Sequence, residues 1–211
     1  MKTQEERAWV RQPSGRRLDL IHPDPNGWDD EDLAVGLSRT YRWAGHSVWS
    51  RPMSVAQHSL LVMHLRASQT PGEELSRADR LRELLHDAEE GLIGFDAISP
   101  LKPVLGPMFA ALMDRLTQAV WMRYGLERWT VDGKRRHKLA DNLAAASEAV
   151  HVAGWTRQEV REVLQIQQVP LHVDPLQAIY GGQAWEPWSA EVSASRFLEA
   201  LQALQDHRLA A

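Results

Sequence analysis

A histidine and an aspartate stand side by side in the most informative segment of the chain, LLHDAEE at residues 84–90. The apolar neighbours of His86 and Asp87 indicate a buried helix face. Burying a carboxylate beside an imidazole is costly unless a partner satisfies both groups, and a divalent cation is an efficient partner. Glu90 follows His86 by four residues and Asp87 by three, so the three side chains can lean over one side of a helix. In that position Glu90 could act as a general acid or base.

Two other predicted helices offer further residues that are compatible with a metal ion. His58 lies on the apolar stripe of a helix expected at residues 54–67, and Asp141 lies on a helix expected at residues 133–152. Each residue is weak evidence alone, because buried histidines are more often satisfied core residues and lone helical aspartates usually face solvent. Three helices that each present such residues on an apolar face together predict a metal site.

The composition restricts both the kind of metal site and the class of protein. The chain has no cysteine, which excludes disulfides, thiolate zinc sites and cysteine nucleophiles. Imidazole and carboxylate ligands suit one divalent transition metal ion such as Co, Mn, Zn, Ni or Fe. The net charge of −4 gives no general basic footprint for duplex nucleic acid. No apolar run approaches the ~20 residues that span a bilayer, and the polar start lacks a secretory signal, so we expect a cytoplasmic protein.

The elements that must position these residues are predicted to be helices. Residues 1–28 contain too many proline and glycine breakers for a long helix, so we expect an extended N-terminal arm with a short strand near residues 17–21. Residues 170–187 are expected to form a loop. Apolar periodicity and capping residues predict helices at residues 29–38, 54–67, 77–92, from Pro107 to before Gly125, 133–152, 156–168 and 189–207. The expected fold class is therefore all-α.

The order of these residues resembles a known protein family. His58, the doublet His86-Asp87 and Asp141 resemble the H…HD…D signature of the HD-domain metal-dependent phosphohydrolases. The gaps of 28 residues from His58 to His86 and 54 residues from Asp87 to Asp141 fall in the usual range of that family. The resemblance covers about residues 35–155. It is specific because the whole ordered set matches, whereas an isolated HD dipeptide would be weak evidence.

Neighbouring motifs narrow the resemblance to the 5′-deoxynucleotidase-like branch. That branch shares an Arg-Trp pair, an E/Q-H-S triplet, an H-D-A-x-E run and a Pro-x-Lys loop. The corresponding residues here are Arg42-Trp43, Gln57-His58-Ser59, residues 86–90 and Pro100-Leu101-Lys102. The resemblance implies an HD-type helical bundle at residues 29–211, with its core at about 35–155 and C-terminal helices at 156–211. It also implies four metal ligands, namely His58, His86, Asp87 and Asp141.

The resemblance also implies roles for residues around the metal. Glu90 would be the general acid that protonates the leaving oxygen, and Arg42 would bind the phosphate. Trp43 would pack near the sugar or base, and Lys102 would add positive charge. The branch has an aspartate directly after the glycine of this loop, whereas this chain has one extra residue before Asp96. The sequence therefore leaves open whether Asp96 contacts the sugar.

The resemblance predicts a nucleotide phosphohydrolase, most simply one that converts deoxyribonucleoside 5′-monophosphates to nucleoside and phosphate. A dNTP triphosphohydrolase could use the same metal site. Two alternatives come from other classes: a nucleotide-binding regulatory HD module without turnover, and an oligonucleotide nuclease, for which the basic residues 134–136 leave room. We expect a small-molecule nucleotide as the partner, no membrane, no stable nucleic-acid partner, and a homo-oligomer that is a dimer or larger.

Two residues near the motif allow simpler structural explanations. Arg42 could serve as an ion-pair partner for Asp29 or Asp30 rather than for a phosphate. Glu148 follows Asp141 by seven residues and shares its helix face, so it could support a metal ligand or form a salt bridge with a nearby arginine.

Overall fold

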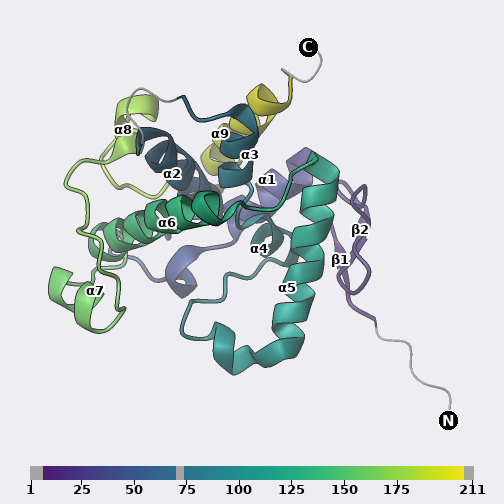
Figure 1. Ribbon diagram of the computed structural model, residues 1–211, viewed down its shortest axis with the longest axis horizontal. Helices are drawn as coiled ribbons and strands as arrows, with labels where there is room; N and C mark the ends of the chain where they lie inside the picture. Colours follow the sequence, from purple (N-terminus) through teal and green to yellow (C-terminus); the bar gives the residue numbers. More distant parts are fainter. Residues whose placement is uncertain (1–6, 70–73, 207–211) are drawn as a thin grey trace.

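The structure, a computed structural model, describes residues 7–69 and 74–206. Within these ranges the chain is mainly helical, with one small antiparallel sheet of two strands (Figure 1). The predicted all-α class is confirmed. Residues 1–6 of the predicted arm and His207, the end of the last predicted helix, lie outside the described residues. In the described part of the chain, no helix has the combined length and apolar character needed to cross a membrane.

The predicted short strand belongs to a hairpin. Strand β1 (Trp9–Arg11) pairs with β2 (Arg17–Asp19). Leu18 and the more distant Trp28 are buried in the same hydrophobic core as the helices. The guanidinium of Arg123 lies 5.3 Å from the centre of the Trp28 ring, which ties this segment to the end of a core helix. The division between an arm and a separate helical domain stays a prediction.

One helix of the bundle, formed by residues 55–68, is almost entirely buried and is surrounded by other helices. The bounds of the helices are α1 (Asp30–Arg39), the 3-10 helix η1 (Arg42–Gly45), α2 (Val55–Ser68), α3 (Arg77–Leu84), α4 (Ala88–Ile93), α5 (Lys102–Tyr124), α6 (Val131–His151), α7 (Arg157–Glu162), α8 (Pro175–Tyr180) and α9 (Ala190–Asp206). Helix α2 is central, since it packs against α1, α3, α6, α8 and α9. The residue before it, Ser54, caps the first turn because its hydroxyl accepts from the amide of Gln57. The α2–α6 contact places two of the predicted metal ligands on facing helices.

The prediction of one continuous helix over residues 77–92 is wrong. Helix α3 ends at Leu84 and α4 begins at Ala88, with a turn between them. In a continuous helix the carbonyl of Glu83 would accept from the amide of Asp87. Here that carbonyl accepts from Nδ1 of His86 at 2.7 Å, so a side chain competes with the helical hydrogen bond. The helix is broken at the two residues of the HD doublet.

Close contact between α1 and α4 fixes the position of this broken segment. A Cβ added to Gly36 would lie 2.3 Å from the carbonyl oxygen of Gly91, and one added to Gly91 would lie 2.5 Å from Cγ of Leu37. The two helices can approach this closely only because glycine occupies both positions. The hydroxyl of Thr40, at the end of α1, also donates to the carbonyl of Glu90 at 3.4 Å.

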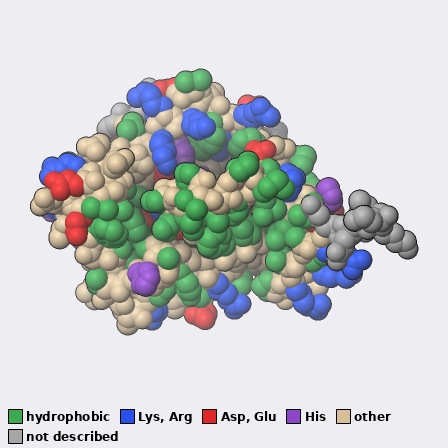
Figure 2. Space-filling view, turned by 90° about the horizontal axis from the view of Figure 1, so that it is seen from below, with side chains coloured by type: hydrophobic (Ala, Val, Ile, Leu, Met, Phe, Trp, Pro, Cys, Tyr) green, Lys and Arg blue, Asp and Glu red, His purple; other side chains and the backbone are tan. Residues whose placement is uncertain are grey.

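Helix α5 ends before Gly125, as predicted, but begins earlier than expected. Its first turn starts at Lys102 and is separated from the regular helix by Gly106, whose φ of 77° is left-handed. Val104 and Met108 near this kink are 78% and 72% exposed. Figure 2 shows hydrophobic side chains gathered across the middle of the face seen from below.

Two further expectations for the C-terminal half need correction. The helix expected at residues 156–168 is shorter, because α7 ends at Glu162. The expected loop at residues 170–187 contains α8, and the carboxylate of Asp174 caps its first turn by accepting from the amide of Leu176. Pro175 follows in the first turn, where its missing amide hydrogen costs nothing.

Candidate metal centre

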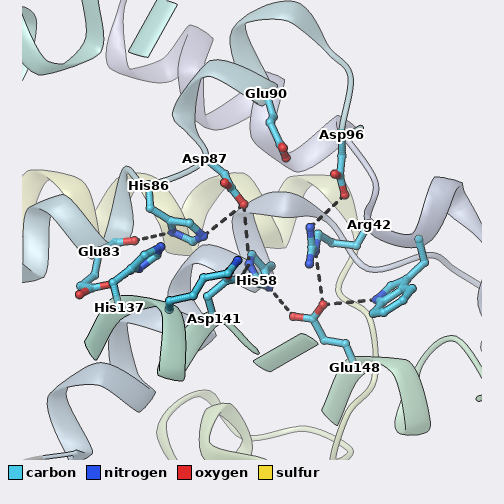
Figure 3. A network of polar contacts seen from close by, with 12 residues as sticks. Arg42, His58, Glu83, His86, Asp87, Glu90, Asp96, His137, Asp141 and Glu148 are labelled. Carbon is cyan, nitrogen blue, oxygen red and sulfur yellow. Dashed lines mark hydrogen bonds and ion pairs between the residues drawn. The ribbon is translucent and has the colours of Figure 1, made fainter. Parts of the chain in front are cut away.

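The four predicted metal ligands come together from three parts of the fold (Figure 3). His58 lies on α2, Asp141 lies on α6, and the doublet of His86 and Asp87 occupies the break between α3 and α4. Ligand atoms of His58, His86 and Asp141 all lie within 4.8 Å of one another. Oδ2 of Asp87 lies 3.1 Å from Nε2 of His86 and 3.7 Å from Nε2 of His58. The cluster of His58, His86 and Asp141 could hold a metal ion.

The hydrogen bonds of the two histidines direct the same nitrogen of each ring toward the cluster. Nδ1 of His86 faces the carbonyl of Glu83 at 2.7 Å, and because a carbonyl can only accept, this nitrogen carries the proton. Nδ1 of His58 lies 2.5 Å from Oε1 of Glu148. Both Nε2 atoms are buried and make no well-directed hydrogen bond among the described residues, and they face the carboxylate oxygens of Asp87 and Asp141. A cation would satisfy both, so the donor set fits a metal ion.

The electrostatics of the cluster favour positive charge at the point where the Nε2 atoms meet. Burial lowers the pKa of His86, but the negative charges of Asp87 and Asp141 outweigh burial and raise it to about 10. Burial would raise the pKa of Asp87, yet His86 and then His58 hold it well below its usual range. Against the effect of burial, His58 and then His86 likewise hold the pKa of Asp141 well below its usual value, so both carboxylates are ionised and attract a cation.

Lys138 orients Asp141, a contact that the sequence interpretation missed. Its ammonium lies 2.7 Å from Oδ2 of Asp141, three residues along the same helix. The other oxygen, Oδ1, lies 3.4 Å from Nε2 of His58. The two oxygens of this carboxylate thus have separate roles, one held by lysine and one facing the cluster. Lysine one turn from a predicted ligand is a signal available in the sequence.

Glu83 and His137 support the opposite side of the cluster. The carboxylate of Glu83 is fully buried and lies 2.7 Å from Nδ1 of His137. The His137 ring is 4.9 Å from the His86 ring and stacks on Trp129 at 4.7 Å. These contacts restrict the orientation of the His86 ring in addition to its hydrogen bond with the carbonyl of Glu83. The position of His137 one turn before Asp141 is the sequence signal for this role.

Arg42 lies at the site and not beside the aspartates of α1. Its Nη1 is 3.1 Å from Oδ2 of Asp96, and its Nε is 3.3 Å from Oε2 of Glu148. Asp29 and Asp30 form their ion pairs with other arginines. The alternative that paired Arg42 with either of them is wrong. The extra residue in the loop does not remove Asp96, which is 7% exposed and bonded to Arg42.

Trp43 has a strained backbone at the rim of this network. Its φ is 57° and that of Ala44 is 52°, in the left-handed region that costs non-glycine residues about 1–3 kcal/mol each. The indole Nε1 of Trp43 donates to Oε2 of Glu148 at 3.3 Å. Two consecutive left-handed residues turn the chain so that neighbouring side chains of η1, Arg42 and Trp43, bind one carboxylate. The sequence gives no signal for this conformation, because neither residue is glycine.

Glu90 and Lys102 form a second polar pair at the site. Glu90 is 1% exposed, and its Oε1 lies 3.4 Å from the ammonium of Lys102. Its Oε2 is buried and has no hydrogen-bond partner among the described residues. Burial, followed by the charges of Asp87 and Asp96, raises the pKa of Glu90 well above its usual value. A carboxyl group in this state can hold and donate a proton.

The fold and the geometry define the class of the chain: an all-α protein with a partly buried histidine–aspartate cluster that could hold a metal ion. The chain is 43% identical over 159 residues to an uncharacterized protein of Rhodobacter capsulatus, a match that covers 75% of this chain and 80% of that protein. The chain belongs to the same family as that protein.

A second relative is matched over a smaller part of its length. The chain is 32% identical over 132 residues to the tRNA modification GTPase MnmE of Thiobacillus denitrificans. The match covers 54% of this chain but only 29% of that protein. No family model matches the chain.

Proposed function

We propose that this chain is a divalent-metal-dependent nucleotide phosphohydrolase of the HD-domain superfamily, in its 5′-deoxynucleotidase-like branch. The proposed reaction hydrolyses deoxyribonucleoside 5′-monophosphates to nucleoside and inorganic phosphate. One observation carries the proposal. Two buried imidazole Nε2 atoms converge with the carboxylates of Asp87 and Asp141, His58 is linked to Arg42 through Glu148, and Glu90 lies beside Asp87 (Figure 3).

His58, His86, Asp87 and Asp141 would hold the ion. When bound, a divalent ion activates water at neutral pH and polarises a phosphoryl oxygen. No thiolate is needed, because imidazole and carboxylate suffice for Co, Mn, Zn, Ni or Fe. The protein contributes the rigid placement of these donors from three elements of the core.

Arg42 and Lys102 would bind the non-bridging oxygens of the phosphate. Each carries a positive charge beside a buried carboxylate, Arg42 beside Asp96 and Lys102 beside Glu90. Two carboxylates hold the plane of the Arg42 guanidinium in place, and its side chain is 15% exposed. Lys102 is half exposed and can move to follow the phosphate.

Glu90 would donate the proton that the leaving sugar oxygen needs. Its burial and the charges of Asp87 and Asp96 raise the pKa of the carboxyl group, which favours the protonated form that a general acid needs. General acid catalysis of this kind contributes about 10²–10⁴-fold in rate. Trp43 and Asp96 border the same network and would contact the sugar or base.

The proposal is tested by a substrate screen with controlled metal content. The purified protein is stripped with a chelator, reloaded with Co²⁺ or Mn²⁺, and incubated with mono-, di- and triphosphates of each nucleoside. Chromatography identifies the products. Release of phosphate from deoxyribonucleoside monophosphates is expected. Release of triphosphate would indicate the dNTP triphosphohydrolase alternative, and binding without release of any phosphate product would reject both in favour of a regulatory module.

An oligonucleotide belongs in the same screen. The basic stretch that left room for a nuclease is partly neutralised, since Arg135 and Arg136 both form ion pairs with Asp132. We therefore expect mononucleotides to be hydrolysed in preference to a labelled oligonucleotide.

A further inference from the structure

Glu148 occupies a central position in the polar network and has no direct place among the metal ligands. It lies on α6, seven residues after Asp141, and faces α2. Its side chain is fully buried. Its two oxygens face the ring of His58 and the side chains of Arg42 and Trp43, so this buried carboxylate lies among hydrogen-bond donors.

Three N–H donors converge on this carboxylate. Nδ1 of His58 lies 2.5 Å from Oε1, while Nε of Arg42 and Nε1 of Trp43 each lie 3.3 Å from Oε2. One oxygen therefore serves a predicted metal ligand, and the other serves two residues predicted to bind the substrate. Figure 3 shows Glu148 between His58 and Arg42.

The bond to His58 determines which nitrogen of that ring is free. A carboxylate oxygen only accepts, so Nδ1 of His58 keeps its proton and Nε2 presents its lone pair to Asp87 and Asp141. The bonds on the other oxygen fix the plane of Arg42 and the indole of Trp43. Both effects require two acceptor oxygens on one side chain.

We infer that Glu148 is a positioning residue that couples the metal site to the substrate site. It orients His58 for the ion and Arg42 and Trp43 for the nucleotide. The part of the inference that concerns Arg42, Trp43 and the nucleotide rests on the proposed function. The part that concerns His58 requires only that the cluster binds an ion. A purely structural role, in which Glu148 neutralises the buried Arg42, would leave metal affinity unchanged.

The substitution Glu148→Gln tests the inference with almost no change in shape. An amide offers one acceptor oxygen and one NH₂ group, so it cannot accept from all three donors. If the amide oxygen faces Arg42 and Trp43, the NH₂ group faces His58 and donates to Nδ1. The ring proton then moves to Nε2, which loses the lone pair that would bind the metal. If the amide is reversed, its NH₂ meets the two substrate-side donors.

The matched control is Asp32→Asn. Asp32 is also a buried carboxylate that accepts from three donors, but they belong to Ser14 and Asp29, away from the four predicted ligands. Affinity for Co²⁺ is measured by competition with a chelator, and the visible Co²⁺ spectrum reports the ligand set. Affinity for deoxyadenosine 5′-monophosphate is measured by calorimetry at saturating Co²⁺.

We expect Glu148→Gln to bind Co²⁺ about 10–100-fold more weakly, with an altered spectrum or weaker nucleotide binding, and Asp32→Asn to keep wild-type affinity. A folded Glu148→Gln protein with wild-type affinity for both would overturn the inference. If Glu148→Gln does not fold, ¹⁵N NMR of the Zn²⁺-loaded wild-type protein decides. A protonated Nδ1 on His58 supports the inference, and an unprotonated Nδ1 overturns it.

These measurements separate the inference from the proposed function. If the wild-type protein hydrolyses no nucleotide while Glu148→Gln still weakens Co²⁺ binding, the enzyme proposal fails and the positioning of His58 stands. If hydrolysis occurs and the substitution leaves both the Co²⁺ affinity and the nucleotide affinity at the wild-type level, the proposed function stands and the coupling through Glu148 is rejected.

Discussion

Replacing Gly91 by alanine should destabilise the protein by forcing apart the two helices that place the HD turn. The added Cβ would lie 2.5 Å from Cγ of Leu37, 2.8 Å from its Cδ2 and 2.8 Å from its backbone nitrogen. The leucine side chain can rotate away from the first two contacts, but the backbone contact requires α1 or α4 to shift.

Overpacking of this kind costs about 1–3 kcal/mol. For a chain of this size each kcal/mol lowers the melting temperature by about 2–4 °C, so the expected decrease is about 2–12 °C. Because the backbone contact cannot be relieved by a rotamer change, we expect the upper half of that range. The shift should also weaken metal binding, since α4 starts directly after Asp87.

Thermal unfolding by circular dichroism, with and without Co²⁺, measures both effects. Gly36→Ala is the companion variant, because its Cβ would lie 2.3 Å from the carbonyl oxygen of Gly91 and meets backbone alone. We expect it to cost at least as much as Gly91→Ala. The double variant should cost less than the sum, since one displacement of the helices relieves both clashes. A melting temperature for Gly91→Ala within about 1 °C of wild type would refute this account of the α1–α4 contact.

Three further predictions concern the site. His86→Ala and Asp87→Ala should each remove metal and activity together, and elemental analysis showing a full complement of metal in either variant would contradict their assignment as ligands. Glu90→Gln should retain metal and lose about 10²–10⁴-fold in turnover, measured as phosphate release, and normal turnover would contradict its role as the acid. Chelation should lower the melting temperature, since an ion at about 100 times its dissociation constant contributes about 2.7 kcal/mol and thus about 5–11 °C, and an unchanged melting curve would argue against a structural role for the ion.

The helical elements of the core could be predicted because their sequence signals are local. Ser54 and Thr130 each cap a helix by accepting from an amide three residues later, and Gly125 ends α5 in a left-handed conformation. The apolar periodicity of a helix was a less reliable predictor of which individual side chains are buried. Leu139 fits the apolar stripe of α6 but is 44% exposed.

The contacts that hold the side chains of the site in place could not be predicted from the sequence to the same degree. The bond from Trp43 to Glu148 joins residues 105 positions apart, and the bond from Arg42 to Asp96 joins residues 54 positions apart. Such contacts depend on tertiary packing, which a single sequence does not report. The sequence limited Glu148 to two roles, support of a ligand or a salt bridge with arginine, and the structure contains both contacts.

The incorrect helix prediction over residues 77–92 has a direct connection with the chemistry. Successive side chains on an α-helix point about 100° apart, so two adjacent residues of a regular helix cannot both reach one point. His86 and Asp87 nevertheless bring Nε2 and Oδ2 within 3.1 Å of each other. The backbone achieves this by leaving the helix, with φ and ψ of −101° and 14° at Leu85 and −116° and 24° at Asp87. The hydrogen bond from His86 to the carbonyl of Glu83 compensates for the lost helical bond. Local propensity therefore fails where two neighbouring side chains must meet at one point, which is the arrangement that a shared cation would favour.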